Sequence, residues 1–334
     1  MKRIPMMAAF AATLLAGSLA WAGDVKNVSW QESKKYSRGV DPAIAVSNDV
    51  AVEIHKTQAN ETKLFYRVGT PDDNGITWGE DYKFEDEGIN PTVAVNAKGQ
   101  VVEIHKGGYA SLLYRVGVVD AATRKISWGP RRSFDTGLVP SVALNDDGVV
   151  VEVHHCPEDD MAAGLTFGLT LKNDLWYHVG VIDMDEKKIK WGDSHKYDKG
   201  DYDNGVAINN NNMVVEVHKS QNSDGLWYRV GKVNLSKKTI SWGDSDQYDN
   251  GVTPEVTLDD AGHVVEVHKS YAHQEIWSHA GQLKDDAKKV SWSSSKKYDD
   301  GMTPDVALNN KNEIIEVHKS ENEDTLWYHR GAVP

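Results

Sequence analysis

Short runs of alternating apolar and polar residues recur along the chain at intervals close to fifty residues. Each unit contains an apolar run, a run such as Val-Glu-Val-His, a run such as Leu-Trp-Tyr-Arg and a run such as Ile-Ser-Trp-Gly. Alternation with a period of two residues is typical of β-strands. One histidine marks the second run of every copy: His55, His105, His154, His218, His268 and His318. The pattern therefore predicts six units, each built from four antiparallel strands.

Polar turns separate the first two runs of each unit. Asn, Asp and Gly fill them, as at residues 96–99 and 259–262, and these residue types tolerate the positive φ angles of tight hairpins. Calcium loops would use the same residue types, but the order of the possible ligands changes from turn to turn and none matches an EF-hand. We therefore predict hairpin turns without calcium.

The two ends of the chain carry complementary fragments of the repeat. Residues 26–30 match a fourth strand that lacks the first three, and residues 326–331 match a third strand that lacks its fourth. A four-stranded unit cannot bury both of its faces alone, so the units must stack on one another. The sequence therefore predicts an all-β fold, a six-bladed β-propeller of four-stranded antiparallel blades, in which the N-terminal strand completes the last blade and closes the ring.

An aromatic residue follows the tryptophan of each fourth strand by six positions. These residues are Tyr36, Phe84, Phe134, Tyr197, Tyr248 and Tyr298. We expect their rings to fill the seams between blades. Packing must stabilise this fold, because the single cysteine, Cys156, cannot form an internal disulfide. The eleven Trp and thirteen Tyr of the chain offer large apolar areas for that packing.

The first 22 residues have the features of a secretory signal peptide. Lys2 and Arg3 precede a short apolar run, and the small residues Ala20 and Ala22 fit the cleavage pattern. We expect residues 1–22 to be a signal peptide, residues 23–334 to form one propeller domain, and the protein to be secreted or periplasmic.

The net negative charge of the chain limits the classes of molecule that it is expected to bind. Removing the two signal-peptide charges from the 37 basic residues leaves 35, against 50 acidic residues. Such a surface disfavours nucleic acid and anionic lipid, and no later apolar run predicts membrane insertion. We therefore expect glycans or a protein as the partner.

Blade three departs from the repeat. His154 and Trp176 lie 22 positions apart, whereas His218 and Trp227 lie nine apart, so we place an insert at about residues 155–175. Long loops on a rigid scaffold often carry function. One hypothesis is therefore a hydrolase or lyase with a single site at the mouth of the ring, built from the insert residues His155, Glu158 and Asp160.

Six glutamates precede the repeat histidines by two positions, and residues two apart on a strand share a face. They are Glu53, Glu103, Glu152, Glu216, Glu266 and Glu316. Pairing His218 with Trp227 would place Glu216 opposite Arg229, and the other glutamates would likewise face a third-strand Arg or His. Catalysis needs an acid once, whereas a sixfold glutamate suits a buried structural pair. We predict a structural role for these glutamates and no catalytic residue among them.

Metal binding has little support in the sequence. His154 and Cys156 could share a strand face, but zinc needs three or four convergent ligands, and no CxxC or HExxH pattern is present. We predict no metal and no cofactor, with calcium and zinc as the weaker alternatives.

Four blades carry a Trp in the third strand, two residues before a His or an Arg. A sugar suits such a group, because its apolar face stacks on indole while its hydroxyls meet charged side chains. Packing between blades suits it equally. The candidate ligand-binding residues are Trp176, His178, Trp227, Arg229, Trp277, His279, Trp327 and His329.

The repeat resembles the small secreted β-propeller lectins of bacteria and fungi, which have blades of similar length and pockets between blades lined by Trp, Arg and Glu. The resemblance is architectural, because the Val-Glu-Val-His run is not a motif of the fucose-binding lectins. It implies a secreted, multivalent carbohydrate-binding protein rather than an enzyme. The alternatives are the hydrolase or lyase at the mouth of the ring and a protein-interaction scaffold.

Overall fold

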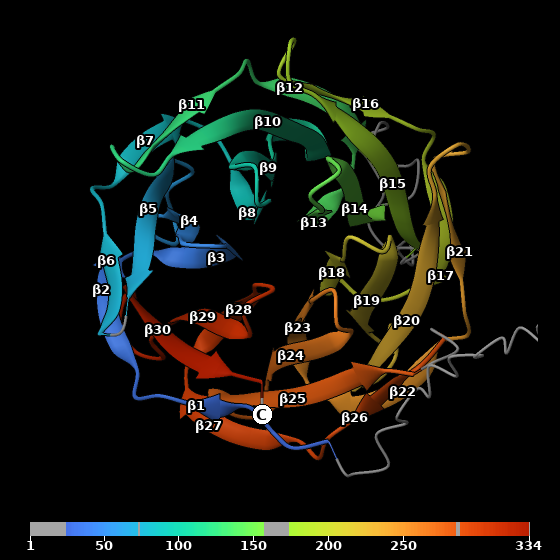
Figure 1. The fold of residues 1–334 in the computed structure, drawn as a ribbon. Helices are drawn as coiled ribbons and strands as arrows, with labels where there is room; N and C mark the ends of the chain where they lie inside the picture. The colour runs from blue at the N-terminus through green and yellow to red at the C-terminus, as the bar shows by residue number, and fades with distance from the viewer. Residues whose placement is uncertain (1–24, 73, 157–173, 285–287, 334) are drawn as a thin grey trace, which may run out of the picture.

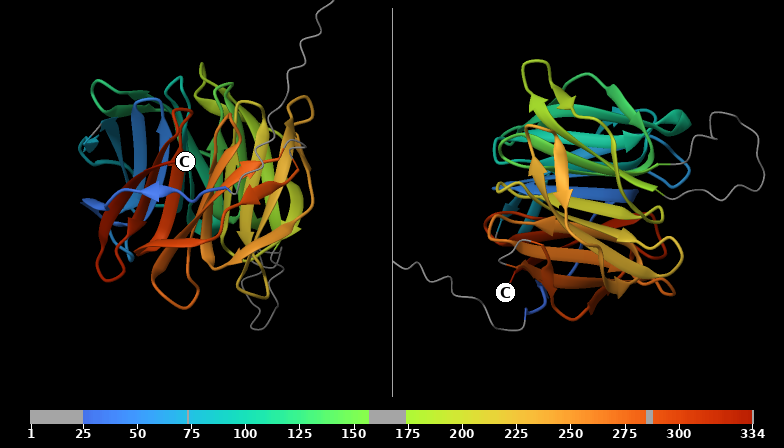
Figure 2. Two further views of the ribbon diagram at one scale, coloured as in Figure 1. Left: turned by 60° about the horizontal axis from the view of Figure 1, so that its bottom comes forward. Right: turned by 90° about the vertical axis from the view of Figure 1, so that its right-hand side faces the viewer.

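The computed structural model describes residues 25–72, 74–156, 174–284 and 288–333. Six antiparallel sheets surround a central axis in this part of the chain (Figure 1). Seen from the side, the sheets pack face against face around the ring (Figure 2). The prediction of an all-β six-bladed propeller is confirmed. The predicted signal peptide and most of the predicted insert lie outside the described residues.

Each blade contains five strands, one more than predicted, in order from the axis outward. Blade one contains β3 (Val40–Ser47), β4 (Val50–Lys56), β5 (Leu64–Asp72), β6 (Gly75–Trp78) and β7 (Tyr82–Glu85). Blade two contains β8 (Ile89–Val95), β9 (Gln100–Lys106), β10 (Ser111–Asp120), β11 (Lys125–Trp128) and β12 (Arg132–Thr136). Blade three contains β13 (Leu138–Leu144), β14 (Val149–Cys156), β15 (Asp174–Asp183), β16 (Lys188–Trp191) and β17 (His195–Lys199).

The other three blades follow the same plan. Blade four contains β18 (Asn204–Ile208), β19 (Met213–Lys219), β20 (Gly225–Asn234), β21 (Thr239–Trp242) and β22 (Asp246–Asn250). Blade five contains β23 (Val252–Leu258), β24 (His263–Lys269), β25 (Glu275–Leu283), β26 (Val290–Trp292) and β27 (Lys296–Asp300). Blade six contains β28 (Met302–Leu308), β29 (Glu313–Lys319), β30 (Thr325–Ala332), β1 (Ser29–Trp30) and β2 (Lys34–Arg38).

The fifth strand exists because the third strand is longer than the fourth. In blade four, β21 pairs with the second half of β20, and β22 pairs with its first half, from Gly225 to Tyr228. Two short strands thus cover the whole outer edge of one long strand, so that edge is not free to pair with another chain.

The ends of the chain meet in blade six, as the sequence predicts. Ser29 pairs with Ala332 and Trp30 with Gly331, and β2 covers the other half of β30. The ring is therefore closed by backbone hydrogen bonds between the first and last described strands.

Aromatic pairs fill the seams. The ring on each fifth strand stacks on the fourth-strand tryptophan of the next blade: Phe134 on Trp191 at 4.7 Å between centroids, and Tyr197 on Trp242 at 5.2 Å. Apolar clusters also span the seams, as where Val151 of blade three packs with Val214 of blade four. The prediction that these aromatic residues fill the seams is confirmed, and most apolar burial lies between blades.

A glycine in the third strand leaves the space that the tryptophan of the fourth strand occupies. A Cβ atom on Gly231 would lie 2.5 Å from Ile240 and 2.7 Å from Trp242. Any larger residue would push the indole ring out of the seam.

The only helical element among the described residues is one 3₁₀ turn, η1 (Gly108–Ala110). No helix among these residues is long and apolar enough to cross a membrane.

Candidate active site

The six innermost strands surround a row of cavities along the axis of the ring. The cavity of about 150 Å³ at one end is lined by the first residues of these strands. Cavities of about 110 and 130 Å³ continue toward the opposite end, between the middle and last residues of the strands. We call the first of these cavities the acidic mouth, because Asp41, Asp203, Glu255 and Asp305 line it.

Most inner strands enter the acidic mouth through a β-bulge that contains a proline. In blade five the bulge lies between Val252 and Glu255, and Thr253 has a positive φ of 50°. The residue after the proline lines the acidic mouth or the cavity next to it. These residues are Ala43, Thr92, Ser141, Glu255 and Asp305 in blades one, two, three, five and six. Gly205 has the equivalent register in blade four, which lacks the proline.

The residue after the proline usually links neighbouring inner strands. The hydroxyl of Ser141 accepts a hydrogen bond from the backbone N–H of Val206 at 3.2 Å. Asp305 makes the same link with a carboxylate. Its Oδ2 accepts a hydrogen bond from the N–H of Ile44 at 2.7 Å, and its Oδ1 accepts one from the N–H of Val306 at 2.7 Å. Two main-chain donors therefore fix the Asp305 carboxylate and favour its charged form.

Glu255 occupies the equivalent position in blade five but does not make this link. Its Oε2 lies 2.6 Å from where a Cβ atom on Gly205 would be, so the glycine of blade four makes room for the carboxylate. Within the described part of the chain, the Glu255 carboxylate makes no hydrogen bond and no ion pair. A half-buried carboxylate without a partner is costly for folding, and such groups concentrate at functional sites.

The third carboxylate comes from blade four, whose entry into the mouth is irregular. β18 begins at Asn204 without the proline of the other blades. Asp203 precedes it, and its Oδ2 accepts a hydrogen bond from the N–H of Thr253 at 3.0 Å. Three adjacent blades thus each contribute one acid to the mouth.

Burial raises the pKa values of all three acids, and for Glu255 the charges of the other two add to the effect. Burial, then the charges of Asp305 and Asp203, raise the pKa of Glu255 well above its ordinary value. Burial raises the pKa of Asp305 to about 7 against the main-chain donors, which lower it. Burial likewise raises the pKa of Asp203. Interacting carboxyls of this kind retain a proton at neutral pH.

Lysines stand at the rim of the mouth, where the second strands end. Lys219 forms an ion pair with Asp201 at 2.6 Å, and Lys56 forms one with Asp41 at 2.8 Å. Lys269 donates to the backbone oxygen of Ser270 at 2.8 Å, and burial lowers its pKa. The rim lysines therefore neutralise Asp41 and Asp201. Asp203, Glu255 and Asp305, deeper in the mouth, form no ion pair with a lysine of the described residues.

At the opposite end of the row of cavities, polar side chains hydrogen-bond to one another. The Asn210 amide donates to Asp146 and to Asp260, both at 2.8 Å, and the Asn310 amide donates to Asp260 at 2.8 Å. These hydrogen bonds therefore connect the hairpins of neighbouring blades.

The structure places the sequence-predicted ligand residues on the third strands, away from the acidic mouth. Trp176, Trp227, Trp277 and Trp327 are half-buried. Their charged neighbours already have partners on the preceding blade: His178 binds Asp135 at 2.7 Å, Arg229 binds Asp198 at 2.6 Å, His279 binds Asp249 at 2.8 Å and His329 binds Asp299 at 2.8 Å. These pairs hold the blades together.

The Glu-x-His pairs are fully buried, but their predicted partners are wrong. Glu216 does lie opposite Arg229, in the predicted register. Its carboxylate instead contacts Nδ1 of His218 at 3.1 Å and accepts from the hydroxyl of Tyr197 at 2.8 Å. Arg229 turns to the preceding blade because Asp198 is more exposed there, so its charge costs less desolvation.

The ends of the insert lie at the mouth side of blade three. His155 pairs with Leu138, which begins the inner strand, and Cys156 pairs with Asp174. His155 is buried and packs on Tyr202, with ring centroids 4.6 Å apart. Glu158 and Asp160, the other residues of the sequence-based hydrolase hypothesis, lie outside the described residues.

Sequence reasoning missed Asp203, Glu255 and Asp305. A signal was available, because only blades five and six carry an acid after the inner-strand proline. This position is not among the residues that the blades share, since it is occupied by a different residue in each blade.

Comparison with known proteins supports the fold. No protein-family model and no curated protein matches the sequence. A protein of unknown function from Dyadobacter fermentans is similar in structure, with a TM-score of 0.63 and 11% identity over 93% of this chain and 100% of that chain. The α-L-arabinanase of Penicillium chrysogenum, complexed with arabinobiose, has a TM-score of 0.56 and 9% identity over 91% and 99%.

Other carbohydrate-cleaving enzymes share this fold. An α-L-arabinofuranosidase from Fusarium graminearum, in complex with an iminosugar inhibitor, has a TM-score of 0.57 and 13% identity over 91% of this chain and 98% of that chain. A sialidase is also similar. At these identities the likeness shows the fold alone. Because the enzymes among these neighbours are glycoside hydrolases and no lectin is identified, the prediction of a lectin-like binding protein is wrong, and the hydrolase alternative is favoured.

Proposed function

We propose that this protein is a glycoside hydrolase whose active site is the acidic mouth. One observation carries the proposal: Glu255, Asp305 and Asp203 converge from three adjacent blades on one cavity, with their pKa values raised. Glycoside hydrolysis generally requires two carboxyl groups, one protonated and one charged, on either side of the scissile bond. The enzymes of similar fold support the same reaction class.

Glu255 is the general acid in this proposal. Burial and the charges of Asp305 and Asp203 keep its carboxyl protonated near neutral pH. Since it makes no hydrogen bond within the described part of the chain, its proton is available to the leaving oxygen of a glycoside. Gly205 leaves the space in which the carboxyl sits.

Asp305 is the charged partner, as nucleophile or as the base that activates water. The N–H groups of Ile44 and Val306 hold both of its oxygens and stabilise the negative charge. Asp203 contributes through its charge, which helps to keep the proton on Glu255. The two reacting carboxyls therefore have different environments, which is how an acid and a base are separated at one pH.

A neutral glycoside is the favoured substrate class. The inner acids of the mouth have no lysine partner among the described residues, and the rim lysines Lys56 and Lys219 are engaged by Asp41 and Asp201. An anionic sugar such as a sialoside would therefore be repelled. Arabinan and aryl α-L-arabinofuranosides are the first substrates to test, because two of the enzymes of similar fold act on arabinose-containing glycans. The predicted signal peptide supports action outside the cytoplasm, where polymeric glycans occur.

The test is hydrolysis of a panel of aryl glycosides and polysaccharides by wild type, Glu255→Gln and Asp305→Asn. We expect kcat/KM to fall by roughly 100-fold or more in each variant, while circular dichroism shows an intact fold. Ser141→Ala is the matched control, since it changes the equivalent position in a blade without an acid. Wild-type inactivity over the whole panel, or full activity of both acid variants, would contradict the proposal.

A further inference from the structure

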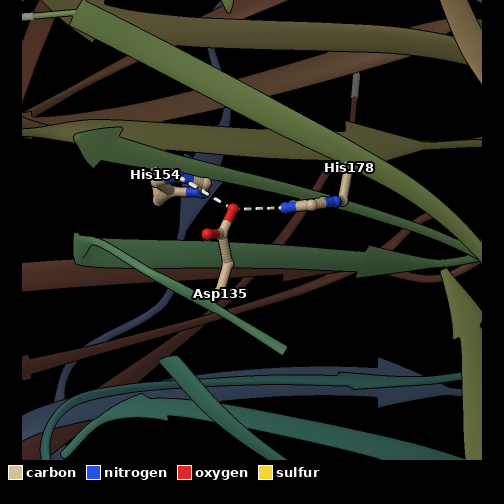
Figure 3. A group of neighbouring side chains, drawn as sticks. All are labelled: Asp135, His154 and His178. Carbon is tan, nitrogen blue, oxygen red and sulfur yellow. Dashed lines mark hydrogen bonds and ion pairs between the residues drawn. The ribbon is translucent and has the colours of Figure 1, made fainter. Parts of the chain in front are cut away.

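Three of the six seams contain a group of two imidazoles and one carboxylate. Figure 3 shows the one in blade three, where Asp135 of β12 approaches His154 of β14 and His178 of β15. Oδ2 of Asp135 lies 2.7 Å from Nε2 of His178 and 3.9 Å from Nε2 of His154. Both histidines are buried, with 1% and 5% of their surfaces exposed.

The other nitrogen of each imidazole already has a partner that only accepts hydrogen bonds. Nδ1 of His154 lies 3.1 Å from both oxygens of Glu152, and Nδ1 of His178 lies 3.3 Å from the backbone oxygen of Gly192. Both Nδ1 atoms must therefore carry hydrogen, so in the neutral rings both Nε2 lone pairs point toward Asp135. Two imidazole nitrogens and one carboxylate oxygen then converge on one point, which either a proton on an imidazole or a bound cation must occupy.

Blade four shows what such a cation does, because an arginine replaces the third-strand histidine there. Nε of Arg229 donates to Oδ2 of Asp198 at 2.6 Å, and Nη1 donates to the backbone oxygen of Gly243 at 3.2 Å. His218 keeps the same relation to Asp198, with Nε2 at 3.9 Å. The repeat thus places a guanidinium cation beside this aspartate where the third strand has Arg, and a second imidazole nitrogen there where it has His.

Blade five repeats the arrangement of blade three. Oδ2 of Asp249 lies 2.8 Å from His279 and 3.6 Å from His268, and Nδ1 of His279 lies 2.9 Å from the backbone oxygen of Ser293.

Blade six does the same. Oδ2 of Asp299 lies 2.8 Å from His329 and 3.9 Å from His318, and Nδ1 of His329 lies 2.7 Å from the backbone oxygen of Gln31. The arrangement is therefore a recurring part of the fold.

We propose that the seams of blades three, five and six each bind one divalent transition metal ion of the zinc type through two His Nε2 atoms and one Asp oxygen. Imidazole and carboxylate are ordinary zinc ligands. Each His donates its remaining N–H to a carboxylate or a backbone carbonyl, as metal-ligating histidines almost always do. The aspartates are partly exposed, with 27% of the Asp135 side chain accessible, which gives the ion a path from solvent.

The experiment measures metal stoichiometry in the full-length mature protein. Chelator-treated protein is titrated with Zn²⁺ by calorimetry, and with Co²⁺ by the visible absorption that a nitrogen-containing site induces. We expect three ions per chain. His178→Arg, which copies blade four, should bind two, and the triple variant with His279→Arg and His329→Arg should bind none.

Arg229→His provides the converse test. It completes the same ligand group in blade four, with His218 and Asp198 already in place, so we expect a fourth ion. This variant decides the matter even where an arginine variant fails to fold, because it asks for a gain. Absence of binding by folded wild type would show that protons occupy these positions and would overturn the proposal, as would stoichiometries that do not follow the His and Arg substitutions.

Discussion

Replacing Glu255 with glutamine should stabilise the protein at alkaline pH while abolishing hydrolysis. The wild-type fold holds Glu255, Asp305 and Asp203 close together, and burial raises the pKa of each. An acid whose pKa is higher in the folded than in the unfolded state costs no stability below its unfolded pKa. The cost grows as pH rises from the unfolded pKa to the folded pKa, and it is constant above that. The wild type should therefore lose stability as pH rises from about 4 to about 7, the range that the Asp305 pKa spans, and further through the raised pKa of Glu255.

The magnitude follows from Asp305. Its pKa rises from 3.8 to about 7, which corresponds to about 4 kcal/mol once the group is ionised. The acids share protons, and water enters the cavity, so only part of this cost belongs to Glu255. We expect Glu255→Gln to gain about 1–3 kcal/mol at pH 9, or roughly 2–6 °C in Tm, because glutamine removes a charge without losing a hydrogen bond.

Thermal unfolding of both proteins at pH 4.5 and at pH 9 tests this reasoning. The stabilisation should be largely absent at pH 4.5, where the carboxyls of the folded protein are protonated. Glu87→Gln, at an exposed acid, is the control and should change Tm little at either pH. A variant that is no more stable than wild type at pH 9, or equally stabilised at both pH values, would refute the account of the acidic mouth.

Three further predictions concern the mouth and the seams. Asp203→Asn removes a charge that raises the pKa of Glu255, so the alkaline limb of kcat/KM should move to lower pH; an unchanged or opposite shift would count against Glu255 as the acid. Gly205→Ala would place a methyl group 2.6 Å from Oε2 of Glu255, so hydrolysis of the best aryl glycoside should drop at least about tenfold with the β-sheet spectrum retained. Tyr197→Phe removes the 2.8 Å hydrogen bond to Glu216 and should lower the free energy of unfolding in urea by about 1.5–3 kcal/mol; a change below about 0.5 kcal/mol would indicate that His218 alone satisfies Glu216.

The architecture was predictable because repetition restates the same physical requirements six times. Period-two alternation, polar turns and the complementary fragments at residues 26–30 and 326–331 each indicate one ring, and they agree. The fifth strand was missed because it is short and its residues alternate weakly. In β22 (Asp246–Asn250), only Tyr248 is apolar, and the strand forms because β20 has a free half-edge to pair with.

The site was not predictable to the same degree, because its chemistry depends on distances between residues of neighbouring blades. Glu255 and Asp305 lie fifty residues apart, and nothing local marks them as neighbours. Gly205 matters only because the Glu255 carboxylate, from the next blade, occupies the space that a larger side chain would fill. The seam groups were hidden in a similar way, since Asp135 joins His154 and His178 from the preceding blade.

The closure of the ring in blade six sets an order on folding. β1 and β30 are separated by about 300 positions of sequence, so blade six can be completed only after the last strand has been made. Loop-closure entropy rises slowly with length, but a contact of such separation cannot form early. We expect five blades to accumulate first as an open arc whose exposed faces are prone to association, and we expect final docking of β1 to be the step that makes the protein resistant to proteases.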